Sequence, residues 1–309
     1  MPAFSGIIPP LVTPLLGRDI LDVAGLERLL EHVVGGGVHG LFILGSTGEG
    51  PGLGYALRRE LITRTCRQVA GRVPVLVGIT DCAFTESLAI AHHAAEAGAA
   101  AVVAAPPFYF PAGQPELADW IDHLATDLPL PLTLYNMPAL TKVSLGMETL
   151  RLAADHPHIV GLKDSSGDLN YYQELLTLKQ RRPDWTILIG PEEKLADSLA
   201  AGGDGGVCGG ANLFPQLFVE IFDAHRAGAL ARVAELHGLV MQASESLYHV
   251  GSYSSAWIKG LKCALSCAGI CDDFMAEPAH RFRAPERTRI AAALRRLAAE
   301  IGGGLTVGT

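Results

Sequence analysis

The sequence predicts an α/β fold, a (β/α)8 TIM barrel with additional C-terminal helices. Short apolar runs recur along the first three quarters of the 309 residues, and a segment with helical spacing follows each. The runs are almost continuously apolar, which is typical of parallel strands buried on both faces. Eight such units within about 225 residues suit a closed barrel better than an open sheet.

The eight predicted strands are bounded by glycine, proline and polar residues. They lie within residues 6–15, 40–47, 73–80, 100–107, 130–138, 159–166, 185–192 and 206–212. The predicted helices between them cover residues 22–34, 57–70, 85–97, 114–126, 168–179 and 215–227. Several of these helices open with a capping residue or a first-position proline.

The remaining stretch predicts three helices outside the barrel, over residues 232–247, 255–267 and 286–301. Their apolar residues recur at helical spacing, which indicates one buried face on each helix. No linker separates them from the preceding units. We therefore expect a barrel over residues 1–228 and a helical extension over 229–309, packed together as a single structural unit.

The composition favours a small-molecule ligand. A formal net charge of −8 and a pI near 5.7 remove the electrostatic basis for nucleic-acid binding. The first apolar run has no basic residues before it and contains three prolines, so neither a signal peptide nor a membrane span is expected. These features predict a cytoplasmic protein without a membrane or nucleic-acid partner.

The six cysteines are scattered, which suits free thiols in a reducing compartment. Cys263, Cys267 and Cys271 are spaced four residues apart, as on one helical face. No histidine or carboxylate completes a familiar ligand set, and the eleven histidines form no metal pattern. We expect small buried helix residues here, with no metal and no organic cofactor.

Lys163 ends the sixth predicted strand, where polar residues of a barrel carry its chemistry. Alternation along strands places Lys163 on one face, and Tyr135 of the preceding strand on the corresponding face. If that face is the interior, the two side chains meet. A neutral amine attacks a ketone to give a Schiff base, and a phenol can shuttle the protons. The alternative is a structural lysine that pairs with Asp164 or extends to the rim.

Two glycine-rich turns also close predicted strands. Residues 45–49, GSTGE, lack the full phosphate-loop spacing, so their hydroxyls and backbone N–H groups suit a carboxylate better. The alternative there is a tight turn with Glu49 as a structural anchor. Residues 205–212, GGVCGGAN, allow close approach of backbone to a ligand or simple crowding, and no phosphate is assigned to them.

The ordered motifs GSTGE, PPFYFP, YNMP, GLKDSSGD, GPEE and GGDGGVCGGAN resemble those of the dihydrodipicolinate synthase / N-acetylneuraminate lyase family. Members of this family are class I aldolases that handle pyruvate through a lysine Schiff base. The resemblance runs from about Gly6 to the C-terminal helices. It implies a (β/α)8 barrel with C-terminal helices, assembled as a homotetramer of two tight dimers.

The resemblance also implies roles for individual residues. Lys163 matches the Schiff-base lysine, and Tyr135 the proton-shuttling tyrosine. Ser46 and Thr47 match the hydroxyl residues that hold the pyruvate carboxylate and join the proton relay. Tyr109 matches the tyrosine that enters the neighbouring site across the tight-dimer interface. The strand-eight residue whose backbone carbonyl faces the pyruvyl group corresponds to Val207.

Departures from the family motifs bear on the substrate. Leu140 occupies the position where dihydrodipicolinate synthases carry an arginine for the second substrate's carboxylate. The stretch YNMPALT is instead similar to that of sialic acid lyases and 2-keto-3-deoxy sugar acid aldolases. Against the sialic acid lyases, Gly209 replaces a serine, and their G-Y-D-E motif is here Gly190-Pro-Glu-Glu193.

We therefore expect a lyase or aldolase that joins or cleaves pyruvate and an aldehyde, acting on a 2-keto-3-deoxy sugar acid or related 4-hydroxy-2-oxo acid. Ser165, Glu192 and Glu193 are candidates for the distal hydroxyls of the substrate. Within the family, the alternatives are a dihydrodipicolinate synthase or a keto-deoxy acid dehydratase. A non-catalytic keto-acid sensor is the alternative from another class.

Overall fold

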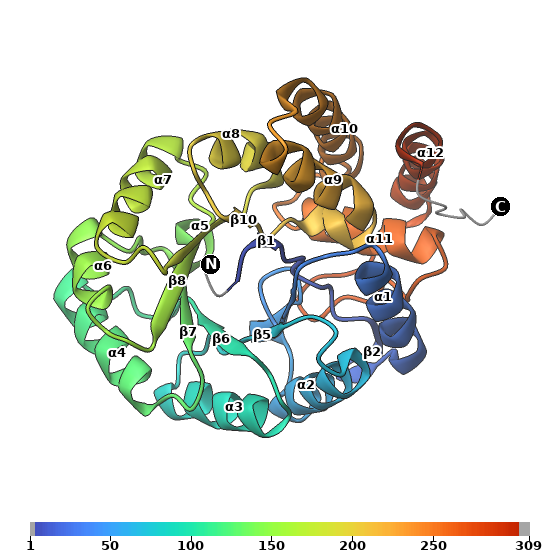
Figure 1. The fold of residues 1–309 in the computed structure, drawn as a ribbon. Coiled ribbons are helices and arrows are strands. Elements are labelled where there is room, and N and C mark those ends of the chain that lie inside the picture. Colours follow the sequence, from blue (N-terminus) through green and yellow to red (C-terminus); the bar gives the residue numbers. More distant parts are fainter. Residues whose placement is uncertain (1–3, 303–309) are drawn as a thin grey trace.

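The computed structural model describes residues 4–302 and contains an eight-stranded parallel sheet surrounded by helices (Figure 1). The strand order is β1-β10-β9-β8-β7-β6-β5-β4. These strands are β1 (Gly6–Ile7), β4 (Leu41–Ile43), β5 (Val75–Gly78), β6 (Ala101–Ala104), β7 (Leu132–Asn136), β8 (Ile159–Asp164), β9 (Thr186–Ile189) and β10 (Gly205–Gly206). From β4 to β10, each strand pairs in parallel with the next strand along the chain, and β10 pairs with β1.

Hydrogen bonds join the two edges of this sheet. Phe42 of β4 donates its N–H to the Pro9 carbonyl at 2.9 Å and accepts from the Leu11 N–H at 2.8 Å. Pro10 and Phe42 form a parallel bridge. The segment after β1 therefore lies beside β4, and the sheet curls round so that neither edge is left open.

Successive residues along the strands enter two different apolar clusters. Leu41 and Ile43 pack between the sheet and the helices, whereas Phe42 points to the inside of the curled sheet. The inner cluster gathers residues from most of the strands: Ile8, Phe42, Leu76, Ala101, Val103, Ala105, Tyr135, Leu188 and Val207. Burial on both faces explains why the strands are so continuously apolar.

Strands β1 and β10 are much shorter than predicted. Pro9 and Pro10 lack an N–H group, so the regular ladder with β10 stops after the Ile8 N–H, which donates to the Gly206 carbonyl at 2.9 Å. At β10, a short helical turn over Gly209–Asn212 replaces the predicted extension. Both corrections affect strand length and leave the strand order intact.

The helices that follow the strands form a ring around the sheet (Figure 1). The predicted helices are present within a few residues of their expected bounds. Three shorter α-helices, α5, α6 and α8, and a β-hairpin were not predicted. The elements are α1 (Val23–Gly35), α2 (Tyr55–Val69), α3 (Phe84–Glu96), α4 (Gln114–Asp127), α5 (Pro138–Thr141), α6 (Met147–Ala153), α7 (Leu169–Leu176), α8 (Leu195–Ala200), α9 (Pro215–Arg226) and the hairpin of β2 (Leu15–Gly17) and β3 (Ile20–Leu21).

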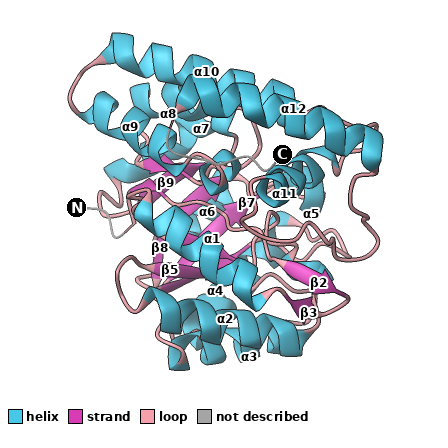
Figure 2. Cartoon of the chain, turned by 90° about the vertical axis from the view of Figure 1, so that its right-hand side faces the viewer, coloured by secondary structure: helices cyan, strands magenta, loops and turns pink. Residues whose placement is uncertain are grey.

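The three C-terminal helices are α10 (Leu230–Tyr248), α11 (Ala256–Cys267) and α12 (Ala284–Ile301). They pack against one another, and α10 also contacts α9 (Figure 2). Because α11 ends at Cys267, Cys271 is not on that helix, which corrects the expectation of three cysteines on one helical face. Residues 1–3 and 303–309, the ends of the two predicted ranges, lie outside the described residues.

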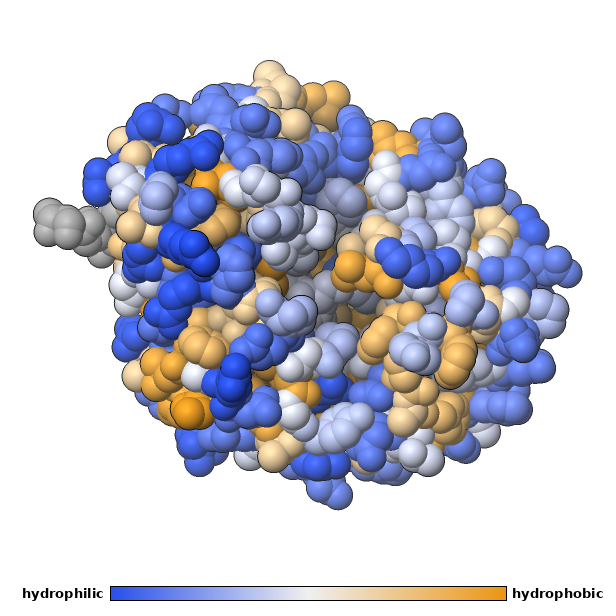
Figure 3. Space-filling model, turned by 180° about the vertical axis from the view of Figure 1, so that it is seen from behind, coloured by the Kyte–Doolittle hydropathy of each residue, from blue (hydrophilic) through white to orange (hydrophobic). Residues whose placement is uncertain are grey.

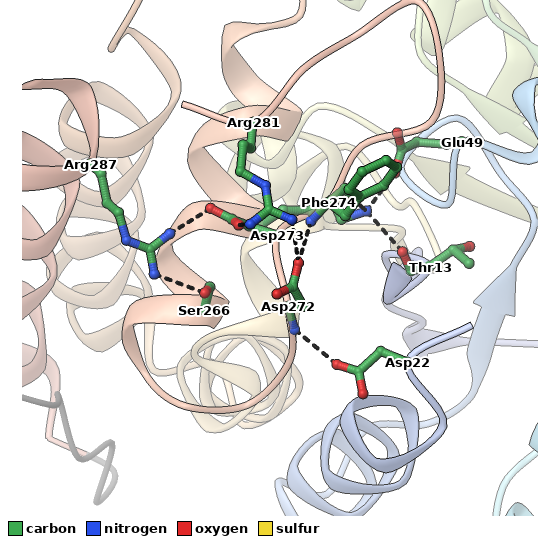
Figure 4. Close-up of polar contacts among 10 residues, drawn as sticks. Thr13, Asp22, Glu49, Ser266, Asp272, Asp273, Phe274, Arg281 and Arg287 are labelled. Carbon is green, nitrogen blue, oxygen red and sulfur yellow. Dashed lines mark hydrogen bonds and ion pairs between the residues drawn. The ribbon is translucent and has the colours of Figure 1, made fainter. Parts of the chain in front are cut away.

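The segment after α11 connects distant parts of the chain (Figure 4). Asp22 accepts the Gly25 N–H at the start of α1 and the Asp272 N–H, at 2.8 and 2.9 Å. Arg287 of α12 pairs with Asp273 at 2.6 Å. These contacts hold the first helix and the last helix against the same short segment. Among residues 4–302, no helix is long and apolar enough to cross a membrane.

Candidate active site

Lys163 and Tyr135 lie opposite each other at the carboxyl ends of β8 and β7. The strand register pairs the two residues directly. The Lys163 Nζ atom lies 4.1 Å from the centroid of the Tyr135 ring and 5.2 Å from that of Phe42. Both side chains are buried, with 5% of each residue exposed. The prediction that the two side chains meet inside the sheet is therefore confirmed.

Lys163 forms no ion pair with any residue between 4 and 302. The neighbouring carboxylate, Asp164, instead accepts hydrogen bonds from the Asn136 amide at 2.8 Å and the Ser166 hydroxyl at 2.8 Å. Burial raises the pKa of Asp164 above its ordinary value. The alternative in which Lys163 pairs with Asp164 is thus not what the structure contains, and the amine is left facing the cavity.

The Tyr135 hydroxyl is placed to exchange protons with its neighbours. It lies 3.4 Å from the Ser46 Oγ atom. Burial alone would raise the pKa of Tyr135, but the adjacent Lys163 ammonium and hydrogen bonds with Ser46, Ser165 and Lys163 outweigh it, so the pKa is lowered. A phenol with a lowered pKa ionises more readily and can both give and take a proton.

A cavity of about 220 Å³ surrounds the Lys163 amine. Most of the predicted site residues line it: Ser46, Thr47, Tyr135, Lys163, Ser165, Glu192, Glu193 and Val207. They come from the ends of five different strands, β4, β7, β8, β9 and β10, as the barrel prediction requires. The prediction that the polar residues at the strand ends converge on one cavity is therefore confirmed.

Two aromatic residues of this cavity were not predicted. Tyr248 ends α10 and Trp257 lies in the first turn of α11, and both line the cavity from the C-terminal helices. Nothing in their local sequence pattern distinguishes them from ordinary helix residues, because their position depends on how the extension packs against the sheet.

The two glutamates of the cavity have polar partners of their own. Glu192 accepts the Gly210 N–H at 2.6 Å and the Tyr248 hydroxyl at 2.9 Å. Burial is the main cause that raises the pKa of Glu192 to about 7. Glu193 accepts the Ser244 hydroxyl of α10 at 2.5 Å. Both carboxylates therefore connect the segment after β9 to neighbouring segments, and both line the cavity.

A second hollow of about 210 Å³ adjoins the first and shares Ser46, Tyr135 and Met137 with it. Leu140, 52% exposed, lines this hollow from α5. The nearby cation Lys142 donates to the Ala139 carbonyl at 2.9 Å. The space-filling view shows the surface hollowed near the middle of the face opposite to that of Figure 1 (Figure 3).

Tyr109 is the predicted residue that the chain does not bring to either hollow. It is 74% exposed, and its ring packs edge-on against Phe110, with centroids 4.8 Å apart. Phe110 is 77% exposed. Within one chain, therefore, Tyr109 lies outside the group formed by Lys163 and Tyr135.

The turn that carries Ser46 and Thr47 is anchored by Glu49 (Figure 4). The Glu49 carboxylate pairs with Lys262 of α11 at 2.7 Å and accepts the Ala276 N–H at 2.8 Å. The side chains of Glu49 and Lys262 are 9% and 0% exposed. This agrees with the alternative in which Glu49 is a structural anchor. Across residues 4–302, no cluster of three or more metal-ligating side chains is present.

The fold and the enclosed amine define an α/β enzyme of the Schiff-base lyase class. A model of the dihydrodipicolinate synthetase family matches residues 3–297, so the chain belongs to that family. The predicted class, a lysine Schiff-base aldolase or lyase of this family, is confirmed, and dihydrodipicolinate synthase remains the alternative within it.

Some of the similar proteins are named as aldolases and others as dihydrodipicolinate synthases. The chain is 33% identical to the "probable 2-dehydro-3-deoxy-D-pentonate aldolase YjhH" of Escherichia coli, over 87% of this chain and 89% of that protein. It is 50% identical to a dihydrodipicolinate synthase structure from Bacteroides thetaiotaomicron, with a TM-score of 0.93 and coverage of 96% and 99%. The Escherichia coli prophage protein YagE, solved in complex with pyruvate, has 30% identity, a TM-score of 0.89 and coverage of 96% and 99%.

Proposed function

We propose that this enzyme reversibly joins pyruvate and an aldehyde through an imine on Lys163, and that its substrate is a 2-keto-3-deoxy sugar acid or a related 4-hydroxy-2-oxo acid. The observation that carries the proposal is the buried Lys163 amine, without a carboxylate partner among residues 4–302 and beside the Tyr135 phenol. A neutral amine is the nucleophile that imine formation needs.

In the cleavage direction, the Lys163 amine attacks the C2 ketone, and the carbinolamine loses water to give a protonated imine. The imine accepts the electron pair of the C3–C4 bond as the C4 hydroxyl loses its proton. An aldehyde leaves, and the pyruvyl enamine takes a proton at C3 before hydrolysis releases pyruvate. Tyr135 and Ser46 exchange the protons, since their oxygens lie 3.4 Å apart next to the amine.

The substrate carboxylate is held by Ser46 and Thr47, in whose turn hydroxyl and backbone N–H donors are available. The backbone carbonyl of Val207 faces the pyruvyl group. Ser165, Glu192 and Glu193 bind distal hydroxyls of the substrate, because all three line the same cavity as Lys163. Their contacts with the protein leave further lone pairs on each side chain for these hydroxyls.

We further propose a complete (β/α)8 barrel over residues 1–228 with the helical extension over 229–309. The enzyme assembles as a homotetramer, and Tyr109 of one copy completes the proton relay of its neighbour. The exposure of Tyr109 and Phe110 supports this proposal, since large exposed aromatic side chains are typical of interfaces.

The second candidate is a dihydrodipicolinate synthase, favoured by the name of the relative that is 50% identical. Leu140 argues against it, because an apolar side chain there supplies no cation for a second carboxylate. A dehydratase would share the imine on Lys163 but release water without breaking a C–C bond. A sensor would bind the keto acid without turnover.

Borohydride trapping tests the mechanism. The enzyme is incubated with pyruvate and sodium borohydride, and its intact mass is measured. We expect a stable pyruvyl adduct on the wild type and on the matched control Lys142→Ala, and no adduct on Lys163→Ala. An unmodified wild-type mass at saturating pyruvate would rule out the Schiff base.

A panel of aldehydes with pyruvate tests the substrate class. Hydroxylated aldehydes should give 4-hydroxy-2-oxo acids, detected by mass spectrometry. If aspartate semialdehyde is turned over faster than every hydroxylated aldehyde, the argument from Leu140 fails. Loss of water from a keto-deoxy acid without aldehyde release would identify a dehydratase, and an adduct without any turnover would identify a sensor.

A further inference from the structure

A separate cavity of about 300 Å³ lies among the C-terminal helices. Its walls come from residues 251–256, from Lys259 of α11, and from the segment 280–286 at the start of α12. It shares no lining residue with the cavity around Lys163. Its size is at the lower end of the range for small-molecule sites, about 300 to 1,000 Å³, which suits a small ligand.

Lys259 is buried in the wall of this cavity, with 5% of the residue exposed. Its ammonium lies 3.5 Å from the His280 Nδ1 atom and 5.2 Å from the centre of the Phe282 ring. His280 Nδ1 is also 3.1 Å from the Arg281 carbonyl. If Nδ1 donates to that carbonyl, it cannot also accept from Lys259. Among residues 4–302, the ammonium therefore has at most one hydrogen-bond acceptor for its three protons.

Lys262, one turn further along α11, shows how the fold satisfies a buried ammonium. Its three donors meet the Thr13 carbonyl, the Glu49 carboxylate and the Phe274 carbonyl, at 2.9, 2.7 and 2.5 Å. Lys259 is also buried, at 5% exposed against 0% for Lys262, but makes no ion pair with any residue between 4 and 302. A buried charge without a partner is costly, so the contrast points to an acceptor that binds from outside the chain.

The same cavity contains a second group without a hydrogen-bond partner among the described residues, and its charge is negative. The Oε2 atom of Glu286 is buried without a hydrogen-bond partner among the described residues. Arg283, also in the wall, forms no ion pair in the described part of the chain and adds a second positive charge. The cavity therefore offers a cationic side for an anion and a carboxylate oxygen that needs a donor.

We propose that this cavity is a second ligand site, separate from the Lys163 cavity, for a small hydroxy-carboxylate. The ligand carboxylate accepts from Lys259 and Arg283, and a ligand hydroxyl donates to Glu286. The hydroxyls of Ser252 and Ser255 line the cavity and supply further polar partners. An anion without hydroxyl donors would leave the Glu286 oxygen unsatisfied and its charge unshielded.

Calorimetric titration with D-gluconate tests the proposal, because this hydroxy acid has no ketone and cannot form an imine. The Lys163→Ala variant should bind it as the wild type does, whereas Lys259→Met should bind at least ~10-fold more weakly, since a buried charged partner is lost. Arg283→Gln should weaken binding as well. Arg289→Gln, an exposed arginine of the same helix, is the matched control and should bind normally.

Acetate and inorganic phosphate separate this ligand class from a general anion site. Acetate should bind more weakly than D-gluconate to the wild type, and Glu286→Leu should abolish that preference. The proposal is overturned if the wild type does not bind D-gluconate, if Lys259→Met binds it normally, or if phosphate binds as tightly with the same dependence on Lys259. Loss of binding in Lys163→Ala alone would place the ligand in the first cavity and would also overturn it. If Lys259→Met does not fold, Arg283→Gln against Arg289→Gln decides the question.

Discussion

At the scale of single residues, the environment of Tyr135 explains how one phenol can serve several proton transfers. It faces an amine and a hydroxyl at once. The charged Lys163 ammonium makes the ionised phenol more stable than burial alone would allow, which is why the pKa of Tyr135 is lowered. A residue with that property matters most where a proton must be taken and returned within one reaction cycle.

Replacement of Tyr135 by phenylalanine should therefore reduce kcat by ~100- to 10,000-fold, the usual size of a lost general acid or base. Tyr171→Phe is the matched control. Its hydroxyl donates to the Leu145 carbonyl at 2.6 Å and does not line the Lys163 cavity, so turnover should change little. Near-normal turnover by Tyr135→Phe would remove the phenol from the mechanism.

Glu192 makes stability depend on pH. Its pKa is raised from the usual 4.5 to about 7, so the folded protein binds a proton that the unfolded chain has released across that interval. The contribution of Glu192 to the free energy of unfolding is therefore fully present below about pH 4.5. It is lost as the pH rises towards 7, and the loss is up to ~3 kcal/mol for this single buried group.

Thermal unfolding measured from pH 5 to pH 8 tests this dependence. Glu192→Gln, which cannot ionise, should lose less stability over that range than the wild type. Glu235→Gln, on the surface of α10, serves as the control and should follow the wild-type curve. Identical curves for the wild type and Glu192→Gln would mean that Glu192 keeps an ordinary pKa.

At the scale of elements, helix α11 supports the site from outside the sheet. Its first turn supplies Trp257 to the catalytic cavity, and Lys262 two turns into the helix holds Glu49 of the turn that carries Ser46 and Thr47. The position of the Ser46 and Thr47 hydroxyls thus depends on a helix that is more than 200 residues away along the chain.

Lys262→Met should destabilise the protein by ~3 to 5 kcal/mol, because Glu49 is left buried without its cation. The melting temperature reports this loss, and KM for pyruvate should rise as the turn loses its anchor. Arg18→Met provides a matched comparison, since its pair with Glu277 is exposed and should be worth under ~1 kcal/mol. Equal effects of the two substitutions would contradict a structural role for the buried pair.

Most elements could be predicted because their signals are local. The apolar runs around Phe42, Val77 and Val103 identify parallel strands, and alternation correctly places Lys163 beside Tyr135. The hairpin over residues 15–21 and the short helix α8 have too few residues for a recognisable period. Tyr248, Trp257 and the Glu49–Lys262 pair could not be predicted, since each depends on how the extension packs on the sheet.

At the scale of the whole molecule, the exposed aromatic residues near Tyr109 bear on assembly. Phe108, Tyr109 and Phe110 follow one another after β6 and are 38%, 74% and 77% exposed. An exposed aromatic group of this size is costly in a monomer and suits a contact between copies. The adjoining hollow, which Phe108 lines, would then lie at that contact.

If the proposed tetramer forms, Phe110→Asp should shift it towards smaller species in analytical ultracentrifugation, and turnover should fall because the proposed contribution of the neighbour's Tyr109 is lost. Tyr109→Phe should keep the assembly and lower turnover alone. Leu230→Asp, at an equally exposed apolar position on α10, is the control. A wild-type monomer with full turnover would refute the shared site.

The pairing of Tyr135 with Lys163 in neighbouring strands also has a consequence for redesign. The spacing between the two groups is set by backbone ladders and not by any loop. Loops beyond the strands can therefore be exchanged to admit new aldehydes while the reactive pair keeps its geometry. A one-residue deletion within β8 should have the opposite effect. It would turn Lys163 to the outer face of the sheet and abolish activity even if every loop were kept.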